Sequence, residues 1–142
     1  MYKKILVTLD GTRTDRAIVE HIKSLAKLLQ SRVVLLHVAT GVPAKYHRSD
    51  AAGKEIEESR AYLDRIRSEF AAAGVSAEAE LAYGEPAAEI IKWVDQKGCD
   101  LVAMSTHGHK FVADLLLGTT AIHVQHGVSV PVLLLRAKPA RN

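Results

Sequence analysis

The chain alternates between two patterns of apolar and polar residues. Short apolar runs, rich in β-branched residues and bounded by polar ones, predict strands over residues 3–10, 31–40, 75–84, 100–105 and 129–137. Between them, apolar residues three or four positions apart predict amphipathic helices over residues 12–29, 50–73, 85–98 and 119–127. The sequence therefore predicts five strands that alternate with four helices along the chain.

Glycine and proline mark several of the predicted boundaries. Gly74 follows the second helix, while Pro86 falls in the first turn of the third helix and Gly98 ends it. The segment VSAEAELAYG alternates apolar and polar residues, which predicts a strand exposed on one side and therefore a sheet edge. Pro131 cannot donate to a ladder, so it indicates a strand start or another edge.

Strict alternation of strands and helices implies right-handed crossovers and a mostly parallel sheet in a three-layer α/β fold. With 142 residues, of which 48% are hydrophobic and 25% charged, the chain is typical of one globular domain covering residues 1–142.

Charge and cysteine content narrow the class of protein. The net charge is only +3 and basic residues are interspersed with acidic ones, so no nucleic-acid-binding stripe is predicted. Cys99 is the single cysteine, which excludes an internal disulfide or a cysteine-based metal site and fits a reducing compartment. The apolar run before Asp10 is far below the roughly 20 residues of a membrane span, so we expect a cytoplasmic protein without membrane partners.

The segment STHGHKFVADLLLGTTA, residues 105–121, carries the candidate chemistry. We expect Ser105–Gly108 to turn out of the fourth strand and present backbone N–H groups, with Gly108 allowing close approach of a phosphate. Gly118, Thr119 and Thr120 are predicted to open a helix with no acidic residue in its first turn, which favours an anion site. The alternative is that Thr119 is a plain N-cap and Gly118 a plain turn.

Asp10 ends the first strand. If that strand is central, Asp10 and the Ser105–Gly108 turn flank one crevice at the carboxyl ends of the strands, where ligands bind in open α/β sheets. Asp10 could accept hydrogen bonds from a ribose hydroxyl or a base amino group, or it could cap the following turn. Neither GxxxxGK[ST] nor GxGxxG is present, so neither a Walker-type ATPase nor the usual dinucleotide-binding fold is indicated.

The segments KKILVTLDGT, VVLLHV, YGEPAAEIIKWV, CDLVAMSTHG, LLLGTTAIHV and VPVLLLR together resemble the universal stress protein (UspA-like) family, in the same order and over essentially the whole chain. The resemblance implies a Rossmann-like open parallel sheet of five strands in the order 3-2-1-4-5, with helices on both faces. Many members are cytoplasmic dimers joined through the last strand, so a homodimer through Val130 to Arg136 is expected.

The chain is similar to the ATP-binding members of that family, which carry Gly, two residues, Gly, nine residues, then Gly followed by Ser or Thr. Here the spacing is intact, with Ser105 in place of the first glycine. The resemblance implies ATP, with Mg, as ligand of a stress-response regulator that hydrolyses it slowly or not at all, and it assigns no catalytic residue and no protein metal ligand. The implied nucleotide-binding residues are Thr8, Asp10 and Val38 at the adenine and ribose, Met104 beside the ribose, Ser105 at the first motif position, and Gly108, His109, Gly118, Thr119 and Thr120 at the phosphates.

Two other functions stay open. The first is a family member that no longer binds nucleotide and acts as a dimeric interaction protein, for which Ser105 is the support. The second is a metal-dependent hydrolase that uses His107, His109, His123 and His126. The aromatic residues Tyr62, Phe70 and Trp93 lie at helical spacing with other apolar residues and are predicted to belong to the core.

Overall fold

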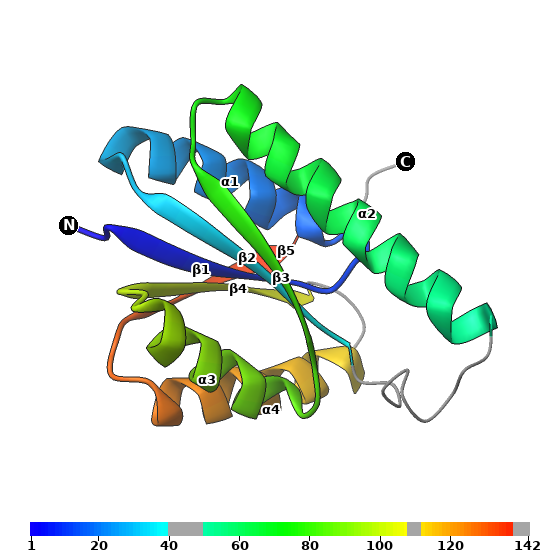
Figure 1. Cartoon of the computed structure of the whole chain (residues 1–142). Helices are drawn as coiled ribbons and strands as arrows, with labels where there is room; N and C mark the ends of the chain where they lie inside the picture. Colours follow the sequence, from blue (N-terminus) through cyan, green and yellow to red (C-terminus); the bar gives the residue numbers. More distant parts are fainter. Residues whose placement is uncertain (40–49, 108–111, 138–142) are drawn as a thin grey trace.

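Five strands and four helices follow one another along the chain in a computed structural model that describes residues 1–39, 50–107 and 112–137. Helices α1 and α2 cover one face of the sheet, and α3 and α4 cover the other (Figure 1). The elements are β1 (Lys4–Leu9), α1 (Asp15–Leu29), β2 (Arg32–Ala39), α2 (Asp50–Ala72), β3 (Ala77–Tyr83), α3 (Pro86–Lys97), β4 (Leu101–His107), α4 (Val112–Gly127) and β5 (Val132–Ala137).

The sheet is parallel and its strand order is β3-β2-β1-β4-β5, which confirms the predicted architecture. β1 is the central strand, since Lys4 pairs with Arg32 of β2 and Ile5 pairs with Leu101 of β4. From β1 the chain moves outward through β2 to β3, then crosses to β4 on the other side. The reversal of strand order therefore lies between β1 and β4.

Side chains at alternating positions of the strands pack into two hydrophobic cores, one on each face of the sheet. On the face covered by α1 and α2, Ile5, Val7 and Leu9 of β1 pack with Ile18 and other buried residues of the helices. On the opposite face, Leu6 packs with Val34, Val102 and the inward residues of α3. The strands are therefore apolar on both faces, as expected of parallel strands buried between helices.

The boundaries of α3 agree with the sequence signals. Pro86 is its first residue, and the preceding Glu85 accepts a hydrogen bond from the Ala88 amide at 2.8 Å as N-cap. Gly98 follows the helix with φ of 66°, a left-handed conformation that favours glycine. β3 and β5 are the two edge strands, and Pro131 directly precedes β5. The predictions for β3 and Pro131 are thus confirmed.

Two boundaries differ from the prediction. β4 runs to His107, because Ser105 and Thr106 continue the ladder opposite Leu135 and Arg136 of β5 instead of turning away from it. α4 begins at Val112 and not at Gly118, because the residues before Gly118 favour a helix and an internal glycine costs only about 1 kcal/mol. Across the described segments, no helix combines the length and apolar character that a bilayer crossing requires.

Candidate functional site

The reversal of strand order places the carboxyl ends of β1 and β4 side by side. β1 ends at Leu9, so Asp10 begins the connection to α1. β4 ends at His107, two residues after Ser105. In doubly wound α/β sheets this position is where ligands bind. The sequence predicts that Asp10 and the Ser105–Gly108 turn flank one crevice; the strand order places β1 beside β4, Ser105 lies within β4, and Gly108 lies outside the described residues.

Three of the predicted nucleotide-binding residues share one face of the sheet. Met104 is buried in the core beneath α3 and α4, and Val38 packs against the same core. Thr8 is two residues beyond Leu6 on β1 and therefore faces the same side. Ser105 follows the alternation of Ala103 and faces the α1 and α2 side instead. Its hydroxyl oxygen is buried and has no hydrogen-bond partner among the described residues.

Asp10 is exposed at the end of β1 and organises the turn that follows it. Its Oδ1 accepts hydrogen bonds from the Thr12 amide at 2.8 Å and from the Thr12 hydroxyl at 2.6 Å. The Thr14 hydroxyl donates to Oδ2 at 3.3 Å. Asp10 therefore caps this turn, which is the alternative role the sequence allowed.

Asp15 is a second carboxylate beneath the same turn, and it is only 2% exposed. Its Oδ2 accepts hydrogen bonds from the Gly11 amide at 2.8 Å and from the Tyr62 hydroxyl of α2 at 2.6 Å. The Asp10 amide donates to Oδ1 at 3.0 Å. Asp15 thus connects the end of β1, the start of α1 and the middle of α2.

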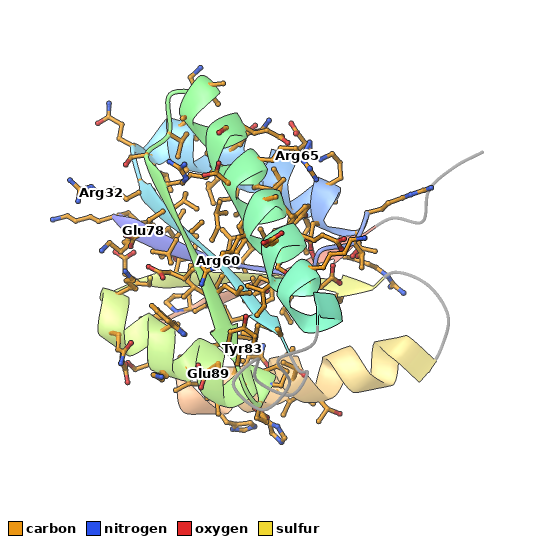
Figure 2. The ribbon with its side chains drawn as sticks, turned by 45° about the vertical axis from the view of Figure 1, so that its right-hand side comes forward. Arg32, Arg60, Arg65, Glu78, Tyr83 and Glu89 are labelled. Atoms are coloured by element: carbon orange, nitrogen blue, oxygen red, sulfur yellow. The ribbon has the colours of Figure 1, made fainter. Side chains whose placement is uncertain are left out.

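The sequence signals did not identify this role of Asp15 and Tyr62. Thr14, the N-cap of α1, makes no side-chain cap hydrogen bond, although threonine is a preferred residue at this position. Tyr62 was predicted to be a core residue; it packs against the core but is half-buried. Arg65 of α2, labelled in Figure 2, lies with its guanidinium carbon 5.3 Å from the centre of the Tyr62 ring. The available signal was the tyrosine hydroxyl, because a partly buried tyrosine usually pairs its O–H group.

Burial sets the protonation behaviour of this pair. It raises the pKa of the Asp15 carboxyl to about 6, although hydrogen bonds from Tyr62 and from the Asp10 and Gly11 amides act in the opposite direction. The nearby charge of Asp10 raises this pKa as well. Burial and the Asp15 contact also raise the pKa of the Tyr62 hydroxyl, so it stays a donor near neutral pH.

The predicted phosphate segment is described only in part. Gly108 and His109 lie outside the described residues. Gly118, Thr119 and Thr120 lie inside α4, so the helix start expected there is wrong for this structure. The same correction puts Asp114 in the first turn of α4, so the prediction of a first turn without an acidic residue is wrong as well.

The histidines proposed for a metal-dependent hydrolase are only partly described. His123 and His126 are both exposed on α4, and His107 ends β4. His109 lies outside the described residues. Among the described side chains, no three His, Cys, Asp or Glu residues are grouped so that they could hold a metal ion.

An open parallel sheet with its strand reversal between β1 and β4 defines the class of α/β proteins that bind ligands at the carboxyl ends of the strands. The sequence model of the universal stress protein family matches residues 1–136, and the chain belongs to this family.

Relatives of known name cover nearly all of the chain. Universal stress protein MJ0577 of Methanocaldococcus jannaschii is 26% identical over 97% of this chain and 97% of its own length. Universal stress protein YxiE of Bacillus subtilis is 29% identical over 96% of this chain and its whole length.

Solved structures share the fold. The structure of MJ0577 aligns with a TM-score of 0.81 and 29% identity, covering 99% of both chains. A universal stress protein in complex with cAMP aligns with a TM-score of 0.72 at 19% identity, over 96% of this chain and 98% of its own. The universal stress protein from Archaeoglobus fulgidus in complex with dAMP aligns with a TM-score of 0.69 at 20% identity, over 94% of this chain and 97% of its own. The last two likenesses concern the fold alone.

Proposed function

We propose that this protein is a cytoplasmic, ATP-binding regulator of the stress response, in which Mg-ATP occupies the crevice between the ends of β1 and β4. The strand reversal carries the proposal, because it brings together β1, which bears Thr8 and leads into Asp10, and β4, which bears Met104. Neighbours of the same fold were solved with cAMP and dAMP, which supports an adenine nucleotide as the class of ligand. The intact spacing from Ser105 to Thr119 supports a triphosphate.

The proposed site divides into two parts. Thr8, Val38 and Met104 would line the adenosine moiety on the face covered by α3 and α4, and Asp10 would accept hydrogen bonds from the ribose. Gly108, His109, Gly118, Thr119 and Thr120 would contact the phosphates. Because α4 spans Val112–Gly127, N–H groups at Gly118 and Thr119 would become available only if the helix began later in the bound state.

The chemistry expected at this site is binding, with hydrolysis slow or absent. The sequence has no phosphate loop of the Walker type, and the family resemblance assigns no catalytic residue. Mg would neutralise phosphate charge when bound with ATP. The protein would then act as a switch whose surface depends on nucleotide occupancy.

The first test is to denature freshly purified protein, identify any released nucleotide by mass spectrometry, and titrate the emptied protein with Mg-ATP in a calorimeter. We expect an adenine nucleotide in the released fraction, or saturable binding at one site per chain. Absence of both results would refute the proposal.

Replacing Gly118 with valine tests the phosphate segment. We expect Gly118→Val to weaken Mg-ATP binding at least about tenfold, because a branched side chain prevents close approach of a phosphate to the backbone. Gly53→Val is the matched control, since Gly53 is also a helical glycine and a Cβ there meets nothing within 4 Å among the described residues. Calorimetry on both variants makes the comparison, and unchanged affinity in Gly118→Val would count against this segment.

A second function, a dimeric interaction protein that binds no nucleotide, is favoured by two observations. The first observation is that Ser105 replaces the first motif glycine and belongs to the β4–β5 ladder. The second observation is that Gly118 and Thr119 lie inside helix α4. Under this function the surface of the dimer, and not the crevice, would carry the activity.

Both functions include a homodimer through Val130 to Arg136. β5 is an edge strand, and Leu134 in it is 39% exposed. Edge strands with apolar side chains pair readily with another chain, whereas a charge on the edge prevents such pairing. We expect the wild type to sediment as a dimer and Leu134→Lys as a monomer, with Leu28→Lys on α1 as the control. A monomeric wild type at working concentration would contradict the dimer.

A further inference from the structure

The buried side chain of Asp15 holds the turn between β1 and α1 in place, although Asp15 is not one of the residues proposed to contact the nucleotide. Asp15 accepts hydrogen bonds from the amides of Asp10 and Gly11, the two residues that follow β1. Asp10 is the residue of this turn that is proposed to meet the ribose. The position of its carboxylate therefore depends on the Asp15 contacts.

We infer that Asp15 is a positioning residue of the nucleotide site, which fixes the Asp10 turn from beneath, and that Tyr62 links this turn to α2. The inference rests on the proposed function. Asp15 is buried at 2% exposure, whereas Asp10 is exposed directly after the end of β1, so the two carboxylates would have separate roles. Asp10 would meet the ligand, and Asp15 would hold the backbone that presents it.

The contact with Tyr62 joins two elements that are far apart in the sequence. The Tyr62 hydroxyl donates to Asp15 at 2.6 Å, and these residues are 47 positions apart. A second connection runs beside it, where Arg16 of α1 forms an ion pair with Glu69 of α2 at 2.8 Å. Movement of the turn on ligand binding would thus be transmitted to α2.

Protonation of Asp15 supplies a readout of this role. A neutral carboxyl is a weaker acceptor for the Asp10 and Gly11 amides than a carboxylate, so nucleotide affinity should fall as the pH drops through about 6. Other titratable or charged groups lie near Asp15 and Tyr62. Asp10 lies in the turn and Arg16 on α1. His37 of β2 is hydrogen-bonded through its Nδ1 to the Leu9 carbonyl at 2.8 Å. Arg65 of α2 and Arg136 of β5 line the groove next to Tyr62.

The experiment measures Mg-ATP affinity by calorimetry from about pH 5 to pH 8 in the wild type, Asp15→Asn and Tyr62→Phe. At the upper pH we expect Asp15→Asn to bind about tenfold more weakly, as for loss of one charge-assisted hydrogen bond. The wild-type affinity should approach that of Asp15→Asn as pH falls. The ratio of the two affinities cancels the titration of ATP and of every other group that both proteins share. Tyr62→Phe should bind more weakly by a smaller factor.

Amide hydrogen exchange separates failure of this inference from failure of nucleotide binding. In the free protein, the Asp10 and Gly11 amides should exchange faster in Asp15→Asn than in the wild type, whereas the exposed control Asp95→Asn should leave them unchanged. Equal exchange rates, or a pH-independent ratio of affinities, would overturn the positioning role. A wild type that binds no Mg-ATP while the exchange rates differ would refute the nucleotide site and leave Asp15 only as an anchor of the turn.

Discussion

Phe70→Ala is expected to lower the free energy of unfolding by about 3–5 kcal/mol. Phe70 is fully buried on α2, in the core that lies between α1, α2 and the sheet. Removal of the ring loses the apolar area that it buries and leaves a cavity in the core that contains Ile66 and Val75. Because the interior is closely packed, the surrounding residues fill such a cavity only in part. For a domain of ordinary stability, about 5–15 kcal/mol, the loss is a large fraction of the total.

Urea unfolding followed by circular dichroism gives this difference, with the wild type and Leu28→Ala measured in parallel. Leu28 is also an apolar helical residue but is 79% exposed, so its truncation should change the free energy of unfolding by less than about 0.5 kcal/mol. A Phe70→Ala loss as small as that of Leu28→Ala would mean that α2 does not pack on the sheet as described.

The contact of Phe70 was predictable because it follows from local periodicity. Ile66 and Phe70 are four residues apart on an amphipathic helix, so both must face the sheet if either does. The limits of α3 were predictable for a similar reason, since Pro86 and Gly98 have backbone preferences that do not depend on the rest of the fold. The strand order came from the family resemblance, because alternation alone allows several orders.

The limits of β4 and α4 were not predictable from local signals. Thr106 suits a strand as well as a turn, and only its pairing with Arg136 of β5 decides between them. The residues before Gly118 are helical in the structure, and an internal glycine costs a helix only about 1 kcal/mol relative to alanine, so propensity alone could not place the start of α4.

The role of Asp15 is a tertiary property. Its burial depends on Tyr62, which lies on another helix. The two residues are far apart along the chain, so no helical or strand periodicity predicts that they are in contact. An acidic residue near a helix start is ordinarily exposed and stabilises the helix dipole. Here the same residue is covered by α2, and burial changes its pKa in the direction opposite to that of a helix N-terminus.

That burial makes the stability of the protein depend on pH in an unusual direction. The pKa of Asp15 is about 6 in the folded chain against an ordinary value of 3.8, so the folded state holds the proton more tightly than the unfolded state. The stabilisation from this group is fully present below about pH 4 and is lost as the pH rises through about 6. The difference of about two in pKa corresponds to about 3 kcal/mol.

The Asp100 carboxyl acts in the opposite direction, and its contribution to the pH dependence has to be separated from that of Asp15. Burial raises the pKa of Asp100, but hydrogen bonds from the Lys3 and Lys4 amides, at 2.9 and 3.0 Å, outweigh that effect and lower it overall. Asp100 therefore contributes stability that is lost on acidification. The total pH profile of the wild type sums both effects.

Comparison of the wild type with Asp15→Asn isolates the contribution of Asp15. The free energy of unfolding of the wild type minus that of Asp15→Asn should fall by about 3 kcal/mol as the pH rises from about 3.5 to about 7, because only the wild type carries this titrating group. Urea unfolding at several pH values measures it, with Asp95→Asn as an exposed control whose difference should stay flat. Parallel profiles for the wild type and Asp15→Asn would mean that the Asp15 carboxyl is solvated, and would remove the physical basis for a buried anchor under the Asp10 turn.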